Sequence, residues 1–352
     1  MTTFIQLHLL TFVPPANLNR DDTGAPKTAI IGGDLRLRLS SQSLKRAWRT
    51  SDIFERRLQG HLSQRTLRFG EEIQARLIAG GAEEKKAQEI TRATIQAFGK
   101  PKAENDKNPL YTEQLAFISP AEREAAFALA ERMAAGETFD DKKKIAAEVL
   151  KRADTAADIA MFGRMFADHP DFNREAAVQV AHAFTTHRVA VEDDYYTAVD
   201  DLNKGDNDMG AGFVGEAGFG SGVFYLYLCI DADLLVANLA GDKDLAKAAL
   251  AALIEAAAKV APNGKQNSFA SRVHTSYLMA EKGSEQPRTL AGAFAKSIKA
   301  PDSLGASRDS LRHLRKNFAT AYGEGDVQAI EMSVEDGKGS LAEVMAFAAD
   351  WA

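Results

Sequence analysis

The sequence has very little cysteine: Cys229 is the only one in 352 residues, so no disulfide can form within the chain. This composition is typical of a reducing compartment, and we expect a cytoplasmic protein in which Cys229 is a small core residue. Apolar runs are short as well, and none approaches the length of about 18 residues that a membrane-spanning helix needs. The N-terminus lacks the basic segment of a secretory signal peptide. We therefore expect no membrane partner.

A surplus of cations is also missing, because the net charge is −6. Such a charge argues against indiscriminate binding to polyanions, although it allows a local basic groove. Residues 20–68 form such a region, with eleven Lys or Arg and five Asp or Glu. Their local charge of +6 leaves −12 for the rest of the chain. Segregated charge of this kind favours a phosphate-backbone partner, and the alternative is a solvated helix face.

Period-two patterns predict strands, and Ala- and Glu-rich stretches predict helices. Strands are predicted over residues 4–13, 34–39, 174–189, 222–231 and 269–282. Helices are predicted over residues 42–58, 244–262, 290–300, 310–323 and 339–352, with further helices between 62 and 171. The result is an α+β fold with about five strands and a helical insertion of about 110 residues, compatible with a split βαβ, RRM-like (ferredoxin-like) sheet.

The most informative stretch is GGDLRLRLSSQSLKRAWRTS, residues 32–51. Alternation along the predicted strand places Arg36 and Arg38 on one exposed face and the leucines in the core. The serines that follow supply the N-cap of a helix, and helical spacing places its apolar residues, Leu44 and Trp48, on one side. The other side carries Gln42, Lys45, Arg46 and Arg49. A cationic strand face next to a helix N-terminus predicts an anion site.

These residues are also part of a longer similarity. The stretch NLNRDDTGAPKTAIIGGDLRLRLSSQSLKRAWR closely resembles the N-terminal signature of CasC, the backbone subunit of the type I-E CRISPR Cascade complex. DIAMFGRMFAD is similar to the central GRM segment of that family. AHAFTTHRVAVEDDYYTAVDDL and GSGVFYLYLCID are similar to the strands around its protruding thumb. The match runs in order over most of the chain, and beyond residue 280 it rests mainly on helix pattern.

The resemblance implies an RRM-like palm (residues 1–58, 174–196 and 223–352), a helical fingers insertion (59–173) and a glycine-rich β-hairpin thumb (197–222). It also implies a non-catalytic subunit that binds CRISPR RNA along its phosphate backbone in antiviral defence. The guide bases then stay free to pair with target DNA, which calls for cations on phosphates rather than base readers. The implied partners are CRISPR RNA, target DNA, further copies of the chain and other Cascade subunits, with no cofactor and no metal.

The charge pattern and the resemblance together indicate the residues that contact RNA. They are Arg20, Lys27, Arg38, Ser40, Gln42, Lys45, Arg46 and Arg49, joined by Arg164 and Met165 of the GRM segment. Met165 is expected at a kink between bases, where an apolar wedge is physically plausible. Lys142, Lys143 and Lys144 are weaker candidates, because a corresponding basic cluster lies near the RNA in this family. Phe213 and Phe219 are the candidates for stacking on a base at the thumb tip.

Two enzymatic alternatives stay open. Asp21 and Asp22 could hold Mg²⁺ for RNA cleavage, as a loop aspartate does in related type III subunits, although capping of their own loop is the simpler explanation. The stretch from Gly210 to Gly215 matches GxGxxG, but a dinucleotide site needs a helix after it and a strand is predicted here. His182 and His187 are five residues apart on a predicted strand, so they are a poor metal pair.

Overall fold

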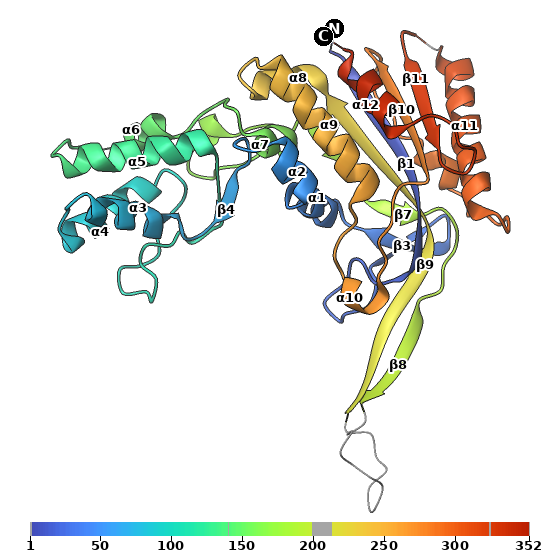
Figure 1. Cartoon of the computed structure of the whole chain (residues 1–352), viewed down its shortest axis with the longest axis horizontal. Helices are drawn as coiled ribbons and strands as arrows, with labels where there is room; N and C mark the ends of the chain where they lie inside the picture. Colours follow the sequence, from blue (N-terminus) through green and yellow to red (C-terminus); the bar gives the residue numbers. More distant parts are fainter. Residues whose placement is uncertain (1, 140, 199–212, 324, 352) are drawn as a thin grey trace, which may run out of the picture.

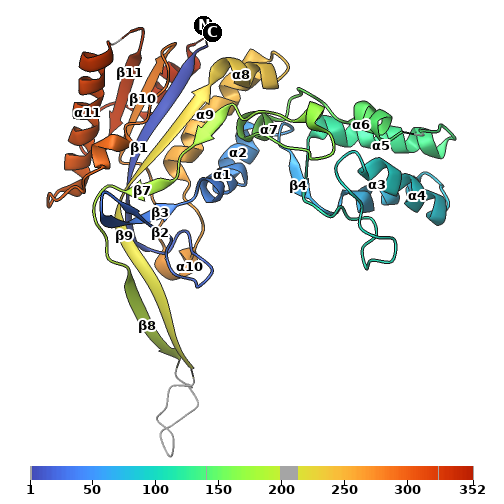
Figure 2. The same cartoon turned by 180° about the vertical axis from the view of Figure 1, so that it is seen from behind.

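The computed structural model describes residues 2–139, 141–198, 213–323 and 325–351. A large sheet with helices on both faces forms the body of the molecule (Figure 1). A helical arm extends from one side of this body, and a two-stranded hairpin projects from one end of the sheet, as the view from behind also shows (Figure 2). The predicted mixed fold of strands and helices is confirmed.

The main sheet is antiparallel, with strand order β11-β10-β1-β9-β7-β3-β2 and with β6 and β8 also paired to β9. Its strands are β1 (Phe4–Ala16), β2 (Thr28–Ile31), β3 (Asp34–Leu39), β6 (Val178–Val180), β7 (Ala183–Thr185), β8 (Glu192–Ala198), β9 (Phe213–Asp231), β10 (Tyr277–Gly283) and β11 (Gln328–Ser333). The pattern-based number of about five strands was too low, because β11 is a half-exposed edge strand and β2 is very short. Residues 174–189, predicted as one strand, hold β6 and β7 with a break between them.

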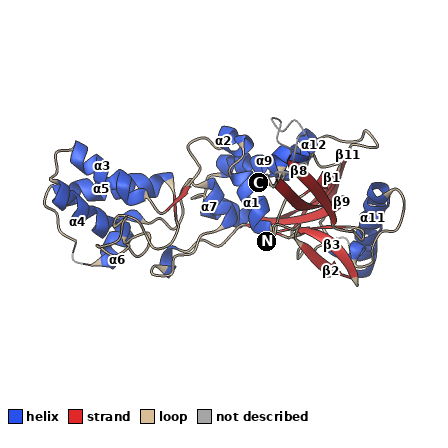
Figure 3. Cartoon of the chain, turned by 90° about the horizontal axis from the view of Figure 1, so that it is seen from below, coloured by secondary structure: helices blue, strands red, loops and turns tan. Residues whose placement is uncertain are grey.

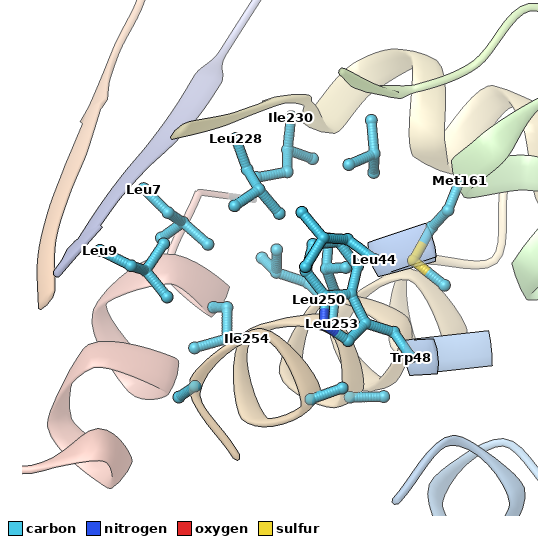
Figure 4. Packing of buried hydrophobic residues seen from close by; sticks show 14 of the residues in the cluster. Leu7, Leu9, Leu44, Trp48, Met161, Leu228, Ile230, Leu250, Leu253 and Ile254 are labelled. Atoms are coloured by element: carbon cyan, nitrogen blue, oxygen red, sulfur yellow. The ribbon is translucent and has the colours of Figure 1, made fainter. Parts of the chain in front are cut away.

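The core forms because β1 and β9 are buried on both faces, as the inner strands of a covered sheet are. On one face Leu7 of β1 and Leu228 of β9 pack against Leu253 of α9 (Lys243–Lys259) (Figure 4). On the other face Leu10 and the buried ring of Tyr225 belong to a second cluster under α11. The sheet therefore lies between two helical layers.

The helices divide between these layers and the arm. The side of α9 also holds α1 (Ser41–Arg49), α2 (Asp52–Arg57), α8 (Ala232–Asn238) and α12 (Leu341–Ala349), and the opposite side holds α11 (Ser303–Tyr322) and the 3-10 helix η2 (Ala291–Phe294). The helix predicted over residues 290–300 is wrong, since η2 is a single turn. Its carbonyl oxygen at Phe294 accepts a hydrogen bond from Arg36 of β3 instead of continuing a helix.

The arm has a hydrophobic core of its own. Its helices are α3 (Phe69–Ala79), α4 (Glu84–Ile95), α5 (Pro120–Ala134) and α6 (Lys142–Val149), and a two-stranded sheet of β4 (Gln64–Thr66) and β5 (Ala116–Ile118) lies where the arm joins the body. The purely helical prediction missed these two strands. After the arm, α7 (Ala157–Phe162) packs Ala160 and Met161 into the main core. Figure 3 shows α7 beside α1 and α2, between the arm and the sheet.

The hairpin pairs β8 with the first residues of β9, from Glu192 opposite Phe219 to Ala198 opposite Phe213. β9 is 19 residues long and continues from the hairpin into the centre of the sheet beside β1. The hairpin is thus a direct extension of a central strand, and every residue of β8 is exposed. Within the described residues, no helix is both long and apolar enough to cross a bilayer.

The predicted cationic face of β3 is wrong for Arg36. Its side chain is fully buried, and its guanidinium donates to the carbonyl oxygens of Thr185 at 2.7 Å and Phe294 at 3.2 Å. Leu35, predicted to lie in the core, is 37% exposed, whereas Leu37 is buried. Arg36 is covered because η2 lies over that part of the strand, so this arginine joins three segments instead of binding a ligand.

Replacement of Arg36 by methionine should lower the free energy of unfolding by about 2–4 kcal/mol, because two buried carbonyl oxygens lose their donors. Urea denaturation followed by circular dichroism measures this. The matched control is Arg38→Met, whose side chain lies nearer the surface and should change stability by no more than about 0.5 kcal/mol. Equal stability of the Arg36 variant and the unmodified protein would contradict a structural role.

Candidate nucleic-acid interface

Helix α1 follows β3 directly, and Ser40 fixes where it begins. Ser40 has an extended backbone (φ −72°, ψ 144°), and its Oγ accepts a hydrogen bond from the Ser43 N–H at 3.3 Å. The predicted serine N-cap is therefore confirmed. The Ser40 N–H donates to Oδ1 of Asn19 at 2.8 Å, which ties the start of α1 to the loop that precedes β2.

The rotation of α1 about its axis is set by its apolar side. Leu44 and Trp48 are buried under α9, and the Trp48 indole N–H donates to the Val260 carbonyl oxygen at 3.2 Å. The polar side, with Gln42, Lys45, Arg46 and Arg49, faces away from this core and lines a cleft of about 920 Å³ beside the arm. Helical spacing predicted this division correctly.

The far wall of the cleft comes from the arm and from the loop after α7. Its lining residues include Arg65, Phe98, Lys100, Gln114, Phe117, Met165 and His169. Arg65 and Lys100 add two cations that the sequence analysis did not name, and Lys100 is paired with Glu113 at 2.7 Å. Their short surroundings, QRT and GKPK, carry no distinctive pattern, and only the fold brings them opposite α1.

Two cations of α1 are held by aromatic rings. Lys45 Nζ lies 5.9 Å from the centroid of the Phe162 ring, and the Arg49 guanidinium carbon lies 5.1 Å from that of Phe117. Partial burial lowers the pKa of Lys45, and burial together with neighbouring cations lowers that of Arg49 against the opposing charge of Asp158. Partly desolvated charges attract an anion more strongly than fully hydrated ones do.

A buried carboxylate lies next to Arg49. Oδ1 of Asp158 accepts hydrogen bonds from the Ser63 N–H at 3.0 Å, the Ser63 hydroxyl at 2.8 Å and the Ile159 N–H at 3.1 Å. Its Oδ2 lies 3.9 Å from Nη1 of Arg49 and has no hydrogen-bond partner among the described residues. Burial raises the pKa of Asp158 to about 6, although the bonds from Ser63 and the charge of Arg49 oppose this.

Arg164 lines the cleft but is nearly buried, and its predicted contact with RNA stays a prediction. Its side chain is 2% exposed and forms a two-pronged ion pair with Glu122, with Nη2 at 2.8 Å from Oε1. The preceding Gly163 has φ 77°, and a Cβ there would lie 3.0 Å from the Arg174 carbonyl oxygen, so the turn requires glycine. This turn leaves Met165 81% exposed at the wall of the cleft, where its predicted place at a base kink stays a prediction.

The remaining predicted cations of the N-terminal region surround one loop. Arg20 is exposed and lines a second hollow of about 650 Å³ on the other side of the α1 N-terminus, together with Ser43. The Lys27 N–H donates to the Asn19 carbonyl oxygen at 2.9 Å, and the Arg38 N–H donates to that of Lys27 at 2.8 Å. The structure thus gathers Arg20, Lys27, Arg38 and Ser40 next to the start of α1.

Asp21 is occupied by its own loop. Its Oδ1 accepts hydrogen bonds from the hydroxyl and N–H of Thr23 at 2.7 and 2.9 Å and from the Ala25 N–H at 3.0 Å, and these bonds lower its pKa. Across the described part of the chain, no three His, Cys, Asp or Glu side chains gather as a metal site. A nuclease that uses Asp21 and Asp22 is not favoured by this arrangement.

Other predicted residues lie apart from the cleft. Lys142, Lys143 and Lys144 are exposed at the start of α6 in the outer arm, and none of them lines the cleft. Phe213 is 57% exposed in the hairpin, next to Tyr196. Phe219 is not at the tip: its ring packs 5.8 Å from that of Phe269 in α10 (Gln266–Phe269) at the hairpin base. Gly210 and Gly212 of the GxGxxG match lie outside the described residues, and Gly215 belongs to strand β9.

The fold and the cleft define a class of mixed α/β proteins in which an antiparallel sheet carries a basic helix, an inserted helical arm and a projecting hairpin. The chain belongs to the family of CT1975-like proteins, which matches residues 5–350. It is similar to a solved chain described as CRISPR RNA-guided surveillance complex, pre-nicking, with 29% identity, a TM-score of 0.86 and coverage of 98% of this chain and 99% of that one.

A second solved chain, described as CRISPR RNA-guided surveillance complex, shows the same fold with a TM-score of 0.75 and 24% identity, over 99% of this chain and 100% of that one. The comparison with curated proteins gave no match. The resemblance to a Cascade backbone subunit, inferred from residue motifs, is confirmed by the family and by the similar solved chain.

Asp158→Asn tests the buried carboxylate beside Arg49. Because the pKa is raised from about 4 to about 6, the stability that this group gives is complete below about pH 4 and is lost as the pH rises through about 6. Between pH 4 and pH 7, the free energy of unfolding of the variant should therefore rise by about 2–3 kcal/mol relative to that of the unmodified protein, because asparagine does not titrate. Urea titrations at several pH values measure the difference, and parallel curves would mean that Asp158 titrates normally.

Proposed function

We propose that this chain is a non-catalytic, multi-copy backbone subunit of a type I-E Cascade complex, which binds CRISPR RNA along its phosphate backbone. The observation that carries the proposal is the cleft that Lys45, Arg46 and Arg49 of α1 line together with Arg65 of the arm. It supports phosphate binding because cations dominate α1, while the family membership indicates which nucleic acid binds there.

A guide-binding subunit must accept any guide sequence. Cations and aromatic rings in the cleft suit this demand. Every RNA sequence has the same phosphates, and every base has a face on which an aromatic side chain can stack. Target DNA would be recognised through base pairing with the guide rather than by this chain. The proposed location is the cytoplasm, in keeping with a chain that has one buried cysteine.

In the finer description that we propose, the body is an RRM-like palm, the arm is the fingers and the hairpin is the thumb. The palm assignment is supported by an antiparallel sheet with β1 between β10 and β9 and with α1 and α9 on one face. Further copies of the chain would assemble along the same RNA. The exposed hairpin supports this part of the proposal, because Tyr195 and Phe213 are more than half exposed and lack cover within the described chain.

Reversal of two cleft charges, Lys45→Glu with Arg49→Glu, should abolish stable RNA binding. Charge-assisted hydrogen bonds contribute about 1.5–3 kcal/mol each, so affinity for single-stranded RNA should fall at least about 100-fold. The slope of log affinity against log salt should become shallower by about 1.4, since each RNA phosphate contributes about 0.7. Fluorescence anisotropy at several salt concentrations gives both quantities.

The matched control for this pair is Lys85→Glu with Lys243→Glu, which changes the charge equally at exposed positions outside the cleft. Thermal melting of both double variants separates loss of binding from loss of folding. RNA affinity that falls equally in the control pair would mean that net charge, and not the α1 cleft, determines binding.

Incubation of the protein with end-labelled RNA and Mg²⁺ tests the proposed absence of catalysis. We expect RNA to be bound and to keep its full length, because Asp21 is held by its own loop. A denaturing gel measures the products. Cleavage that disappears in an Asp21→Asn, Asp22→Asn variant would establish the ribonuclease alternative instead.

A further inference from the structure

A histidine lies against Arg38 where the sheet is interrupted. Between β6 and β7, the six steps from Val178 to Phe184 lie opposite only five steps on β9, from Ile230 to Tyr225, so the ladder contains a bulge. His182 lies in this bulge and has an exposed ring. Its Nδ1 lies 2.7 Å from Nη1 of Arg38 on β3.

This contact fixes the state of the imidazole. A guanidinium has donors only, so Nδ1 of His182 must accept the hydrogen bond and the ring proton must lie on Nε2. Partial burial and the charges of Arg38 and Lys27 lower the pKa of His182. The free protein therefore presents a neutral imidazole, with an Nε2–H donor, beside two cations.

Within the part of the chain that the structure describes, the surrounding elements hold these groups without pairing them with a carboxylate. Arg38 is steadied by a second bond, from its Nε to the Thr28 carbonyl oxygen at 3.4 Å. Lys27 and Arg38 line one small depression at the hairpin base. On β9, the hydroxyl of Tyr227 is turned to Gln6 at 2.7 Å, and burial raises its pKa, so it stays neutral near pH 7. Among the described residues, the two charges that act on the pKa of His182, those of Arg38 and Lys27, are both positive.

The three groups offer only donors to a ligand, so an anion with several oxygen acceptors fits them. A phosphodiester group has this chemistry. Its charge would offset those of Arg38 and Lys27 and would thus raise the pKa of the imidazole. If Arg38 turns its Nη1 to the anion, Nδ1 of His182 becomes free to take a proton.

Resting on the proposed function, we propose that His182 is a further ligand of the RNA phosphate backbone, together with Arg38 and Lys27, and that RNA binding there takes up a proton. The bound imidazole has the higher pKa, so its extra affinity is complete below the pKa of the free protein. This affinity is lost as the pH rises through the pKa of the bound form. Over the range in which His titrates, RNA binding should strengthen as the pH falls.

The test uses the full chain and a single-stranded RNA of one length, at constant ionic strength between pH 5.5 and 8.5. His182→Asn keeps an acceptor near Nδ1 and removes the Nε2 donor, and His182→Gln keeps a neutral donor near Nε2. At about pH 6 we expect each variant to bind about 5- to 10-fold more weakly than the unmodified protein. At about pH 8 the Gln variant should be within about 2-fold of it.

Calorimetry in two buffers of different ionisation enthalpy should show that the proton uptake of the unmodified protein falls in both variants. His313→Gln on α11, another exposed histidine, is the matched control and should keep the full uptake. Asp158→Asn is the second control. It measures how much of the proton uptake comes from the carboxyl group beside Arg49 and not from His182.

Unchanged affinity and uptake in both His182 variants would overturn this inference while leaving RNA binding through Lys45 and Arg49 intact. So would a loss of affinity that is equal at pH 6 and pH 8 with unchanged proton uptake, since it would mean that His182 only positions Arg38. Absence of RNA binding by the unmodified protein at every pH would overturn the proposed function as well.

Discussion

The burial of one side of α1 is the constraint on which the proposed interface depends. Trp48 has no exposed surface, and full burial of a large apolar side chain contributes about 1.5–3 kcal/mol. Its indole N–H is also committed to Val260. The helix cannot roll about its axis without losing both interactions, so Lys45 and Arg49 face the cleft before any ligand arrives. Ligand binding then does not have to orient the helix that carries these charges.

The opposite wall depends on a different interaction, a carboxylate–guanidinium pair inside the arm. Glu122 both caps α5 through the Ser119 N–H and binds the buried Arg164. Loss of either partner would leave a buried charge alone, which is strongly unfavourable. The two walls belong to separate hydrophobic clusters, and Asp158 of α7 connects them through Ser63. The junction between the two walls therefore contains a carboxyl group whose pKa burial raises to about 6.

The sequence predicted the exposed side of α1 correctly, and it predicted the bounds of β3 correctly but not which of its side chains are exposed, for a physical reason. Helical periodicity distinguishes a buried from an exposed side within a single element, so the polar side of α1 was visible without a structure. Arg36 and Arg38 have the same chemistry and share a face of β3. They differ only because η2, more than 250 residues further along the chain, covers the first of them. The opposed cations Arg65 and Lys100 were invisible for the same reason: tertiary contacts place them.

The hairpin suits a different kind of contact from the cleft. Its described residues include Glu192, Asp193, Asp194 and Glu216 and no Lys or Arg, so this part of the molecule repels phosphate. It presents aromatic side chains instead: Tyr196 lies over Gly215, where a Cβ would approach the ring to 2.5 Å, and near Phe213 at 6.1 Å. Cross-strand pairs of this kind contribute only about 0.2–1 kcal/mol, so the hairpin depends on its continuation into β9 for order. If the proposed function holds, the cations of the body and arm bind the RNA backbone, and the hairpin contacts uncharged surfaces, base faces or a neighbouring protein chain.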